Sequence, residues 1–152
     1  MSIYSDNLFE EVLFKPMKSG ANKLYVVSGY ATANMVVRHF EYAKTQNKDI
    51  SINLIAGMYV QDGILKNNHI SFKELQNGQG DVNFNCSYIN SMPPVHSKVY
   101  SWFKDDEPIV GFIGSANYTQ NTFSVSIREV FSPIDASECK MYYDQLIGDS
   151  LS

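Results

Sequence analysis

The chain has only two cysteines, no long apolar run and no apolar stretch at its start. Cys86 and Cys139 form no CxxC pair and have no histidine at metal-ligand spacing, so we interpret both as reduced thiols of a cytoplasmic protein. No apolar run approaches the roughly 20 residues of a membrane-spanning helix. Acidic residues in "MSIYSDNLFEEVLF" (1–14) precede any apolar run, which is unlike a secretory signal. The sequence therefore predicts neither a disulfide-stabilised scaffold nor a membrane partner.

Basic residues are in slight deficit and are unevenly distributed. Twelve Lys and Arg against sixteen Asp and Glu give a net charge of −4 at pH 7. Through Lys104 the basic residues exceed the acidic ones by two, whereas the rest of the chain has six more acidic than basic residues. Because binding to phosphate backbones depends on positive charge, we expect this domain alone to bind DNA weakly.

With 152 residues, 44% hydrophobic and 18% charged, the chain is expected to form one domain over 1–152. Apolar periodicity predicts helices at 7–17, stopped at Pro16, at 32–47 with Thr32 as N-cap, and at 136–147. The stretch 69–80 is expected to form a short helix followed by a glycine-rich loop. Strands are predicted at 24–27, 49–59, 82–89, 99–103, 109–113 and 124–131. The strand–helix–strand opening favours parallel pairing, so the expected fold class is α/β, with a mixed central sheet flanked by helices.

The stretch "VHSKVY" (95–100) places a histidine and a lysine two residues apart. On a strand, alternate side chains share a face, so His96 and Lys98 would project together. Two potential cations repel each other there unless an anion lies between them. An imidazole, with an unperturbed pKa of about 6.5, is a competent nucleophile near neutral pH. An ammonium beside it can neutralise phosphate oxygens, so the pair indicates phosphodiester chemistry.

The stretch "GFIGSANYT" (111–119) supplies further polar groups. A serine hydroxyl and an asparagine amide can donate hydrogen bonds to phosphate, although Ser and Asn taken alone would indicate only a turn. Downstream, Glu129 lies in the predicted strand 124–131, where its carboxylate could hydrogen-bond the second imidazole nitrogen and fix its tautomer. No cofactor or metal is predicted. The predicted catalytic residues are His96, Lys98, Asn117 and Glu129, and the predicted phosphate ligands are Lys98, Ser115 and Asn117.

The order H-x-K, then G-S-x-N, then an acid resembles the signature of the phospholipase D superfamily over 95–130. The resemblance implies a phospholipase D-like fold and a metal-independent reaction. It implies that His96 is a nucleophile that becomes a covalent phosphohistidine, that Lys98 and Asn117 bind the phosphate, and that Glu129 supports the histidine.

One position departs from the superfamily pattern. The superfamily usually has an aspartate five residues after the lysine, and here that residue is Phe103. A similar lapse is found in the nuclease branch of NgoFVII-type restriction endonucleases, which the stretch "LYVVSGYATANMV" (24–36) also resembles.

Three functions are open at this point. The first is a metal-independent phosphodiesterase that cleaves DNA, as the nuclease module of a restriction endonuclease. The second is a phospholipid or small phosphodiester hydrolase, and the third is a degenerate nucleic-acid-binding or assembly module, which Phe103 keeps open. Because the chain has one HxK motif and the leaving oxygen needs its own proton donor, we expect a homodimer with a shared active site. We also expect sequence recognition to lie in a separate or missing domain.

The other polar clusters are interpreted as structural. His39 and His69 have no neighbouring lysine in an HxK pattern, so neither is a candidate nucleophile. The consecutive acids at 105–107 are typical of a solvated turn rather than of a magnesium site.

Overall fold

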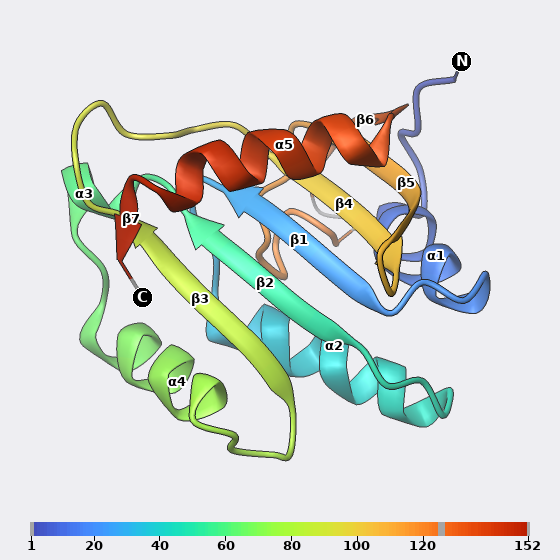
Figure 1. Ribbon diagram of the computed structural model, residues 1–152, viewed down its shortest axis with the longest axis horizontal. Helices are drawn as coiled ribbons and strands as arrows, with labels where there is room; N and C mark the ends of the chain where they lie inside the picture. Colours follow the sequence, from blue (N-terminus) through green and yellow to red (C-terminus); the bar gives the residue numbers. More distant parts are fainter. Residues whose placement is uncertain (1, 125–126, 152) are drawn as a thin grey trace.

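A mixed sheet of seven strands, in the order β6-β5-β4-β1-β2-β3-β7, forms the centre of this computed structural model, which describes residues 2–124 and 127–151 (Figure 1). The strands are β1 (Lys23–Ser28), β2 (Ser51–Ala56), β3 (Asn83–Ile89), β4 (Val99–Lys104), β5 (Glu107–Gly114), β6 (Phe131–Ile134) and β7 (Ser150–Leu151). The helices are the π-helix η1 (Phe9–Phe14), α1 (Lys15–Lys18), α2 (Ala33–Thr45), α3 (Tyr59–Asp62), α4 (Lys66–Gln76) and α5 (Ala136–Ile147).

The strand pairing decides which loops meet. Strands β1, β2 and β3 are parallel to one another, as the opening of the sequence predicts, whereas β4 runs antiparallel to β1 and β5 antiparallel to β4. Val99, at the start of β4, pairs with Val27 near the end of β1 and with Ile113 near the end of β5. The entry to β4 and the exit from β5 therefore lie at the carboxyl edge of the parallel strands (Figure 1).

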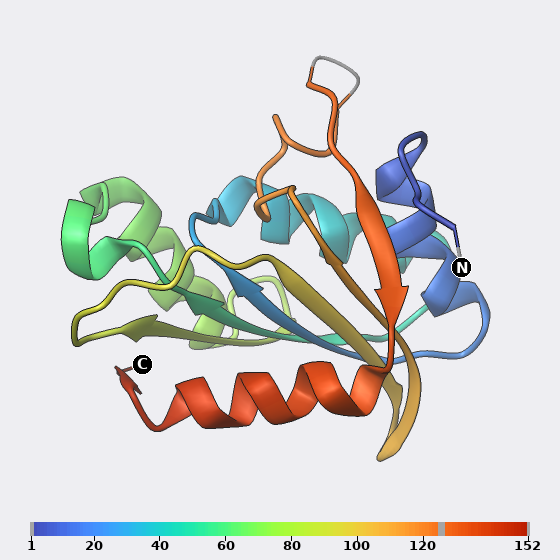
Figure 2. The same ribbon diagram turned by 90° about the horizontal axis from the view of Figure 1, so that it is seen from above.

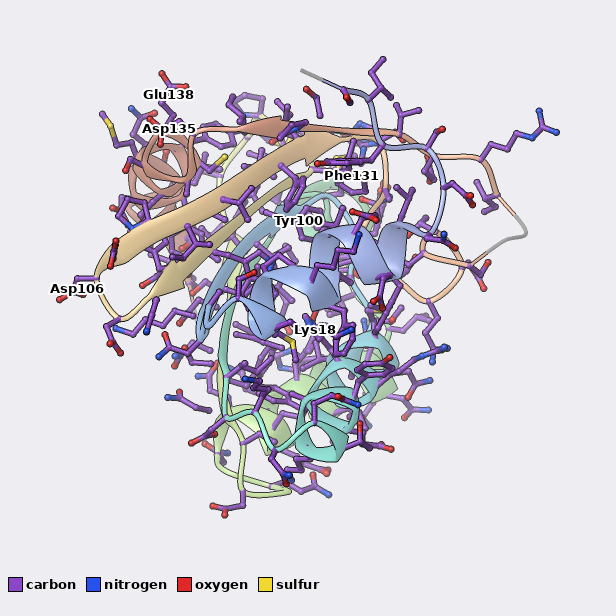
Figure 3. The ribbon with its side chains drawn as sticks, turned by 90° about the vertical axis from the view of Figure 1, so that its right-hand side faces the viewer. Lys18, Tyr100, Asp106, Phe131, Asp135 and Glu138 are labelled. Atoms are coloured by element: carbon purple, nitrogen blue, oxygen red, sulfur yellow. The ribbon has the colours of Figure 1, made fainter. Side chains whose placement is uncertain are left out.

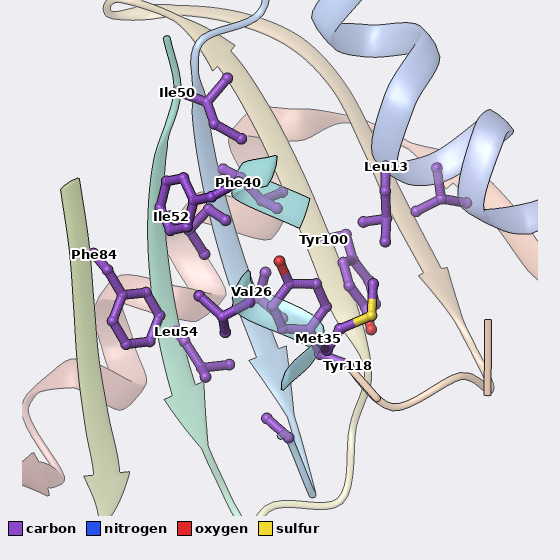
Figure 4. Packing of buried hydrophobic residues seen from close by; sticks show 14 of the residues in the cluster. Leu13, Val26, Met35, Phe40, Ile50, Ile52, Leu54, Phe84, Tyr100 and Tyr118 are labelled. Carbon is purple, nitrogen blue, oxygen red and sulfur yellow. The ribbon is translucent and has the colours of Figure 1, made fainter. Parts of the chain in front are cut away.

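Helices cover both faces of the sheet, so the predicted α/β class is confirmed. Helices α1, α2 and α4 lie on one face and α5 lies on the other (Figure 2). Alternate residues of the central strands, such as Val26, Leu54 and Tyr100, are buried on the first face (Figure 4). On the other face, α5 buries Cys139 and Tyr143 against the sheet, as its periodicity predicts. Both cysteines are free and buried.

Several boundaries differ from the sequence prediction. Helix α4 begins at Lys66 rather than at 69, and β2 ends at Ala56 rather than at 59. The first helix does not end at Pro16, because this proline occupies the first turn of α1, where no backbone donor is required. The predicted strand at 124–131 is also wrong where the structure describes it: 127–130 is irregular and the strand begins only at Phe131. Ile127 and Val130 are each 46% exposed, so their apolar side chains do not form a buried strand face. Residues 125–126 of that prediction lie outside the described residues.

His39 is a structural residue, as predicted, but it is more deeply buried than a helix surface position would suggest. Its Nε2 lies 2.9 Å from the carbonyl oxygen of Leu13, and its Nδ1 lies 2.7 Å from the hydroxyl of Tyr118. The carbonyl can only accept, so Nε2 carries the proton and Nδ1 accepts from the tyrosine. Burial lowers the pKa of His39 to about 4, although the hydrogen bond to Leu13 acts in the opposite direction.

This buried imidazole predicts acid sensitivity. Between pH 6.5 and 4 the unfolded chain binds a proton at His39 that the folded chain does not, so the stabilisation present above pH 6.5 is lost as the pH falls. The shift corresponds to about 3 kcal/mol of unfolding free energy. Urea unfolding of the wild type and of His39→Gln from pH 7 to pH 4 should show a steeper decline for the wild type. Parallel declines would contradict the prediction.

The acidic turn between β4 and β5 is solvated and structural. Asp105 has a left-handed backbone (φ 55°), and Asn22 hydrogen-bonds both its carboxylate and its backbone N–H. Asp106 projects from the tip of the hairpin, 3.9 Å from Lys23 (Figure 3). In the described ranges, no three His, Cys, Asp or Glu side chains are grouped as metal ligands. Within the same ranges, no helix has the length and apolar character needed to cross a bilayer.

Candidate active site

The predicted His96–Lys98 pair is formed, in the segment that leads into β4. Both residues precede Val99, the first residue of the strand, yet their side chains meet. The Nζ atom of Lys98 lies 3.0 Å from Nδ1 and 3.1 Å from Nε2 of His96. His96 is exposed, whereas Lys98 is only 8% exposed. Burial lowers the pKa of Lys98, and the negative charge of Glu129 opposes that shift. A second anion beside Lys98, such as a phosphate, would stabilise its charged form further.

Asn117 lies beside this pair, and Gly29 shows how close the approach is. A Cβ atom on Gly29 would lie 3.4 Å from Cδ2 of His96, 3.5 Å from Oδ1 of Asn117 and 3.0 Å from Cγ of Met58. Glycine at the end of β1 therefore lets the segment before β4 and the loop after β5 converge on one point. This is the carboxyl edge of the parallel strands, where open α/β sheets bind ligands.

The amide of Asn117 has a defined orientation. Its Oδ1 accepts a hydrogen bond from the backbone N–H of Tyr30 at 3.2 Å, and the hydroxyl oxygen of Ser28 lies at the same distance from it. Because Oδ1 accepts from Tyr30, the Nδ2 end of the amide points away from that N–H and can donate to a phosphate oxygen. The loop that carries Asn117 is also held by β4, since the hydroxyl of Tyr100 donates to the carbonyl oxygen of Ala116 at 2.8 Å. Thr122 donates to the carbonyl oxygen of Asn117.

Ser28 is a positioning residue that the sequence analysis missed. Its hydroxyl lies 2.5 Å from the carbonyl oxygen of Tyr30 and accepts from the backbone N–H of Tyr118 at 3.0 Å. Ser28 therefore connects the end of β1 to Tyr30, which contacts the Asn117 side chain, and to Tyr118, which follows Asn117 in the chain. In the sequence, the Ser-Gly pair indicates only the end of a strand, so no local signal reveals this role.

Loss of the Ser28 hydroxyl should therefore affect catalysis. We expect Ser28→Ala to lower kcat/KM about tenfold, the value of one lost hydrogen bond. Ser101→Ala is the matched control, because Ser101 is equally buried in a neighbouring strand but donates to the carbonyl oxygen of Ala136, the first residue of α5. Steady-state cleavage kinetics and thermal melts of both variants check the prediction. Equal activity of the two variants would show that Ser28 has only a structural role.

Glu129 lies near the site but does not make the predicted contact. Its Oε1 accepts a hydrogen bond from the hydroxyl of Ser115 at 2.7 Å, and the same hydroxyl accepts from the backbone N–H of Val130 at 2.9 Å. Among the hydrogen bonds of the described residues, none joins Glu129 to His96. The prediction that Glu129 lies on a strand is also wrong, since it precedes β6. Ser115 thus links Glu129 to the GSxN loop.

Phe103 lies at the opposite end of β4 from the site. It is buried and packs edge-on against Tyr25, with ring centroids 5.7 Å apart, and it pairs with Lys23 at the start of β1. Phe103, the residue that departs from the superfamily pattern, therefore has a packing role at the end of β4 far from Lys98. It makes no contact with His96 among the contacts of the described residues.

Solved structures share this fold. A phospholipase D family member, Nuc from Salmonella typhimurium, is 12% identical with a TM-score of 0.68, covering 99% of this chain and 96% of that one. NucT from Helicobacter pylori is 15% identical with a TM-score of 0.65, covering 99% of this chain and 97% of that one. Polyphosphate kinase from Porphyromonas gingivalis is 14% identical with a TM-score of 0.58, covering 96% of this chain but 22% of that one. The fold is that of the phospholipase D superfamily.

The family assignment follows from the sequence itself. A family model, the NgoFVII restriction endonuclease N-terminal PLD domain, matches residues 6–152, and the chain belongs to this family. The class inferred from the HxK and GSxN motifs, a phosphodiesterase of the endonuclease branch, is the class of this family. A comparison with curated proteins finds no match.

Proposed function

We propose that residues 1–152 form one catalytic domain that cleaves DNA phosphodiesters without a metal ion. The observation that carries the proposal is the contact of the Lys98 ammonium with both ring nitrogens of His96, with Asn117 beside them at Gly29. Between them, these groups supply a nucleophile, a positive charge and a hydrogen-bond donor around one point. Attack on a phosphodiester requires that combination.

The reaction has two displacements at phosphorus. A nitrogen of His96 attacks the phosphorus atom, the P–O bond to the leaving oxygen breaks, and a P–N bond to the imidazole forms. A second imidazole gives its proton to the leaving oxygen. Water then attacks the phosphohistidine and gives a proton back to that second imidazole, which breaks the P–N bond and restores the imidazole of His96. Lys98 and Asn117 hold the non-bridging oxygens in both steps, because both are donors whose positions are fixed by burial or by hydrogen bonds.

The rival functions have less support. A degenerate binding module was suggested by Phe103, but this residue packs against Tyr25 at the far end of β4 while His96, Lys98 and Asn117 remain together. Family membership favours DNA over a phospholipid as substrate. The two buried free thiols support the predicted cytoplasmic location.

We also propose a homodimer with one shared active site, which binds DNA together with a separate recognition domain. One imidazole cannot attack phosphorus and protonate the leaving oxygen on its far side, so a second His96 is needed. Ile113 and Val130, which flank the Ser115 loop, are each 46% exposed and offer an apolar surface for a two-fold contact. The family model describes an N-terminal domain, which agrees with recognition of the DNA sequence by a different domain.

Plasmid cleavage tests the proposed function. We expect the protein to nick supercoiled DNA in excess EDTA, because imidazole, ammonium and amide groups supply the chemistry. The control is His96→Ala, which should leave the plasmid intact at the same concentration. Activity that disappears with EDTA and returns with magnesium would overturn the proposal.

A further inference from the structure

A pocket lies next to the proposed active site. It has a volume of about 780 Å³, within the usual range for small-molecule sites, and lies between the loop after β1 and the segment that joins α3 to α4. Figure 1 shows α3 and the start of α4 beyond the carboxyl ends of β1, β2 and β3. Its lining includes two tyrosines, an acid and a base: Tyr30, Tyr59, Asp62 and Lys66.

The backbone segment 29–30 contacts both the pocket and the proposed phosphate site. Tyr30 follows Gly29, the glycine between His96 and Asn117, and the backbone N–H of Tyr30 donates to Oδ1 of Asn117. On the other wall, the backbone N–H of Met58 donates to the carbonyl oxygen of Gly29 at 2.9 Å. Asn117, which would bind the phosphate through Nδ2, is therefore held through Oδ1 by the backbone of a residue that lines the pocket.

The aromatic walls are held in place by hydrogen bonds. The hydroxyl of Tyr30 donates to the carboxylate of Asp62. The hydroxyl of Tyr59 donates to the carbonyl oxygen of Ala31 at 2.8 Å, and the two rings lie edge to face with centroids 5.8 Å apart. Asn68 bonds both the N–H of Ala33 and the carbonyl of Ala31. Rings fixed in this way bind a flat ligand with little loss of side-chain entropy.

We propose that this pocket binds one unstacked nucleobase of the nucleotide next to the scissile phosphate, with Tyr30 as its stacking surface. The inference rests on the proposed function, because it places the phosphate of the same DNA strand at His96 and Asn117. Aromatic rings stack on any base, and the acceptor-only carboxylate of Asp62 suits bases with an exocyclic amino group. Lys66 lines the same pocket, so the lining carries one basic and one acidic side chain.

This occupancy has a consequence for substrate choice. A base can enter the pocket only after it leaves the duplex stack, which costs least in single-stranded or locally open DNA. The pocket should therefore contribute most to the binding of single-stranded or locally open DNA.

Binding of short oligonucleotides tests the pocket separately from cleavage. The probes are single-stranded trinucleotides with one 2-aminopurine, placed in turn at each position, and competitors in which that base is replaced by an abasic tetrahydrofuran. The protein carries His96→Ala to prevent cleavage, alone or with Tyr30→Leu or Tyr30→Phe. Removing the base should weaken binding roughly 5- to 150-fold when a ring is present at position 30. In the Tyr30→Leu protein the same removal should matter less than about twofold, a non-additive result.

Quenching of 2-aminopurine emission should follow the same pattern, strong with Tyr30 or Tyr30→Phe and absent with Tyr30→Leu. If base removal has no effect on binding to the protein with Tyr30 intact, the pocket assignment is wrong, however the leucine variant folds. An equal base effect in all three proteins also overturns it. Plasmid cleavage by the chain with His96 intact is measured in parallel. Cleavage with no base effect rejects the pocket alone, whereas a Tyr30-dependent base effect without cleavage rejects the proposed nuclease function.

Discussion

A dimer in which one chain carries His96→Ala is expected to retain almost none of the DNA cleavage of the wild-type dimer. The first displacement needs a nucleophile on one side of the phosphorus and a proton donor for the departing oxygen on the other, and the second needs a base that takes a proton from the attacking water. Each chain offers one HxK motif, with Lys98 directly against His96. If two chains share one site, removal of a single imidazole stops either the attack or the protonation.

Differently tagged chains allow this prediction to be measured. Co-expression followed by two affinity steps isolates the mixed dimer, and sedimentation confirms its stoichiometry near neutral pH. A mixed dimer of wild-type and Lys140→Ala chains is a suitable control, because Lys140 pairs with Asp144 on α5, away from the site. Mixed His96→Ala dimers that keep half the wild-type activity, or active monomers, would disprove the shared site.

Glu129→Gln is expected to slow cleavage by about 10²- to 10⁴-fold, the upper figure being the cost of losing an orienting acid in a serine-protease triad. The carboxylate is the anion that counteracts the effect of burial on the pKa of Lys98, and it accepts the hydrogen bond of Ser115. A neutral amide would leave Lys98 without that support. We further propose that, in the dimer, the carboxylate of Glu129 orients the imidazole of His96, as the sequence pattern predicts.

Ser115→Ala separates the two roles of Glu129. If the carboxylate acts only by holding the serine, Ser115→Ala should lose as much activity as Glu129→Gln, and the double variant should lose no more. If it acts on Lys98 and on the imidazole, Ser115→Ala should lose about tenfold or less. The kcat of the three variants decides the matter, and a Glu129→Gln enzyme with near-normal kcat would remove Glu129 from the site.

Much of the fold could be predicted because its signals are local. Helix α5 has an apolar face at helical spacing and follows Asp135, which caps it, so its range 136–147 is visible in the sequence. Thr32 likewise caps α2, as its position before an apolar periodic run predicts. The parallel pairing of β1 and β2 follows from the intervening helix. The contact between His96 and Lys98 could be predicted from these two residues and their spacing alone.

The remaining features depend on contacts between distant segments. Ser28 and Asn117 are 89 positions apart. Gly29, Met58 and His96 come together because β2 runs parallel to β1 and β4 runs antiparallel to it. The position of Glu129 was mispredicted because alternating apolar residues imitate a strand although they are exposed. Spacing along the chain shows which residue types are available, but not which hydrogen bond each one makes.

The stereochemical course at phosphorus tests the central claim most directly. A phosphorothioate diester of defined configuration, cleaved in water labelled with heavy oxygen, reports whether the phosphorus is attacked once or twice. Attack by His96 followed by attack by water gives two in-line displacements, so the account predicts overall retention of configuration. Overall inversion would mean that water attacks the phosphodiester directly, and would contradict the role of His96 as nucleophile.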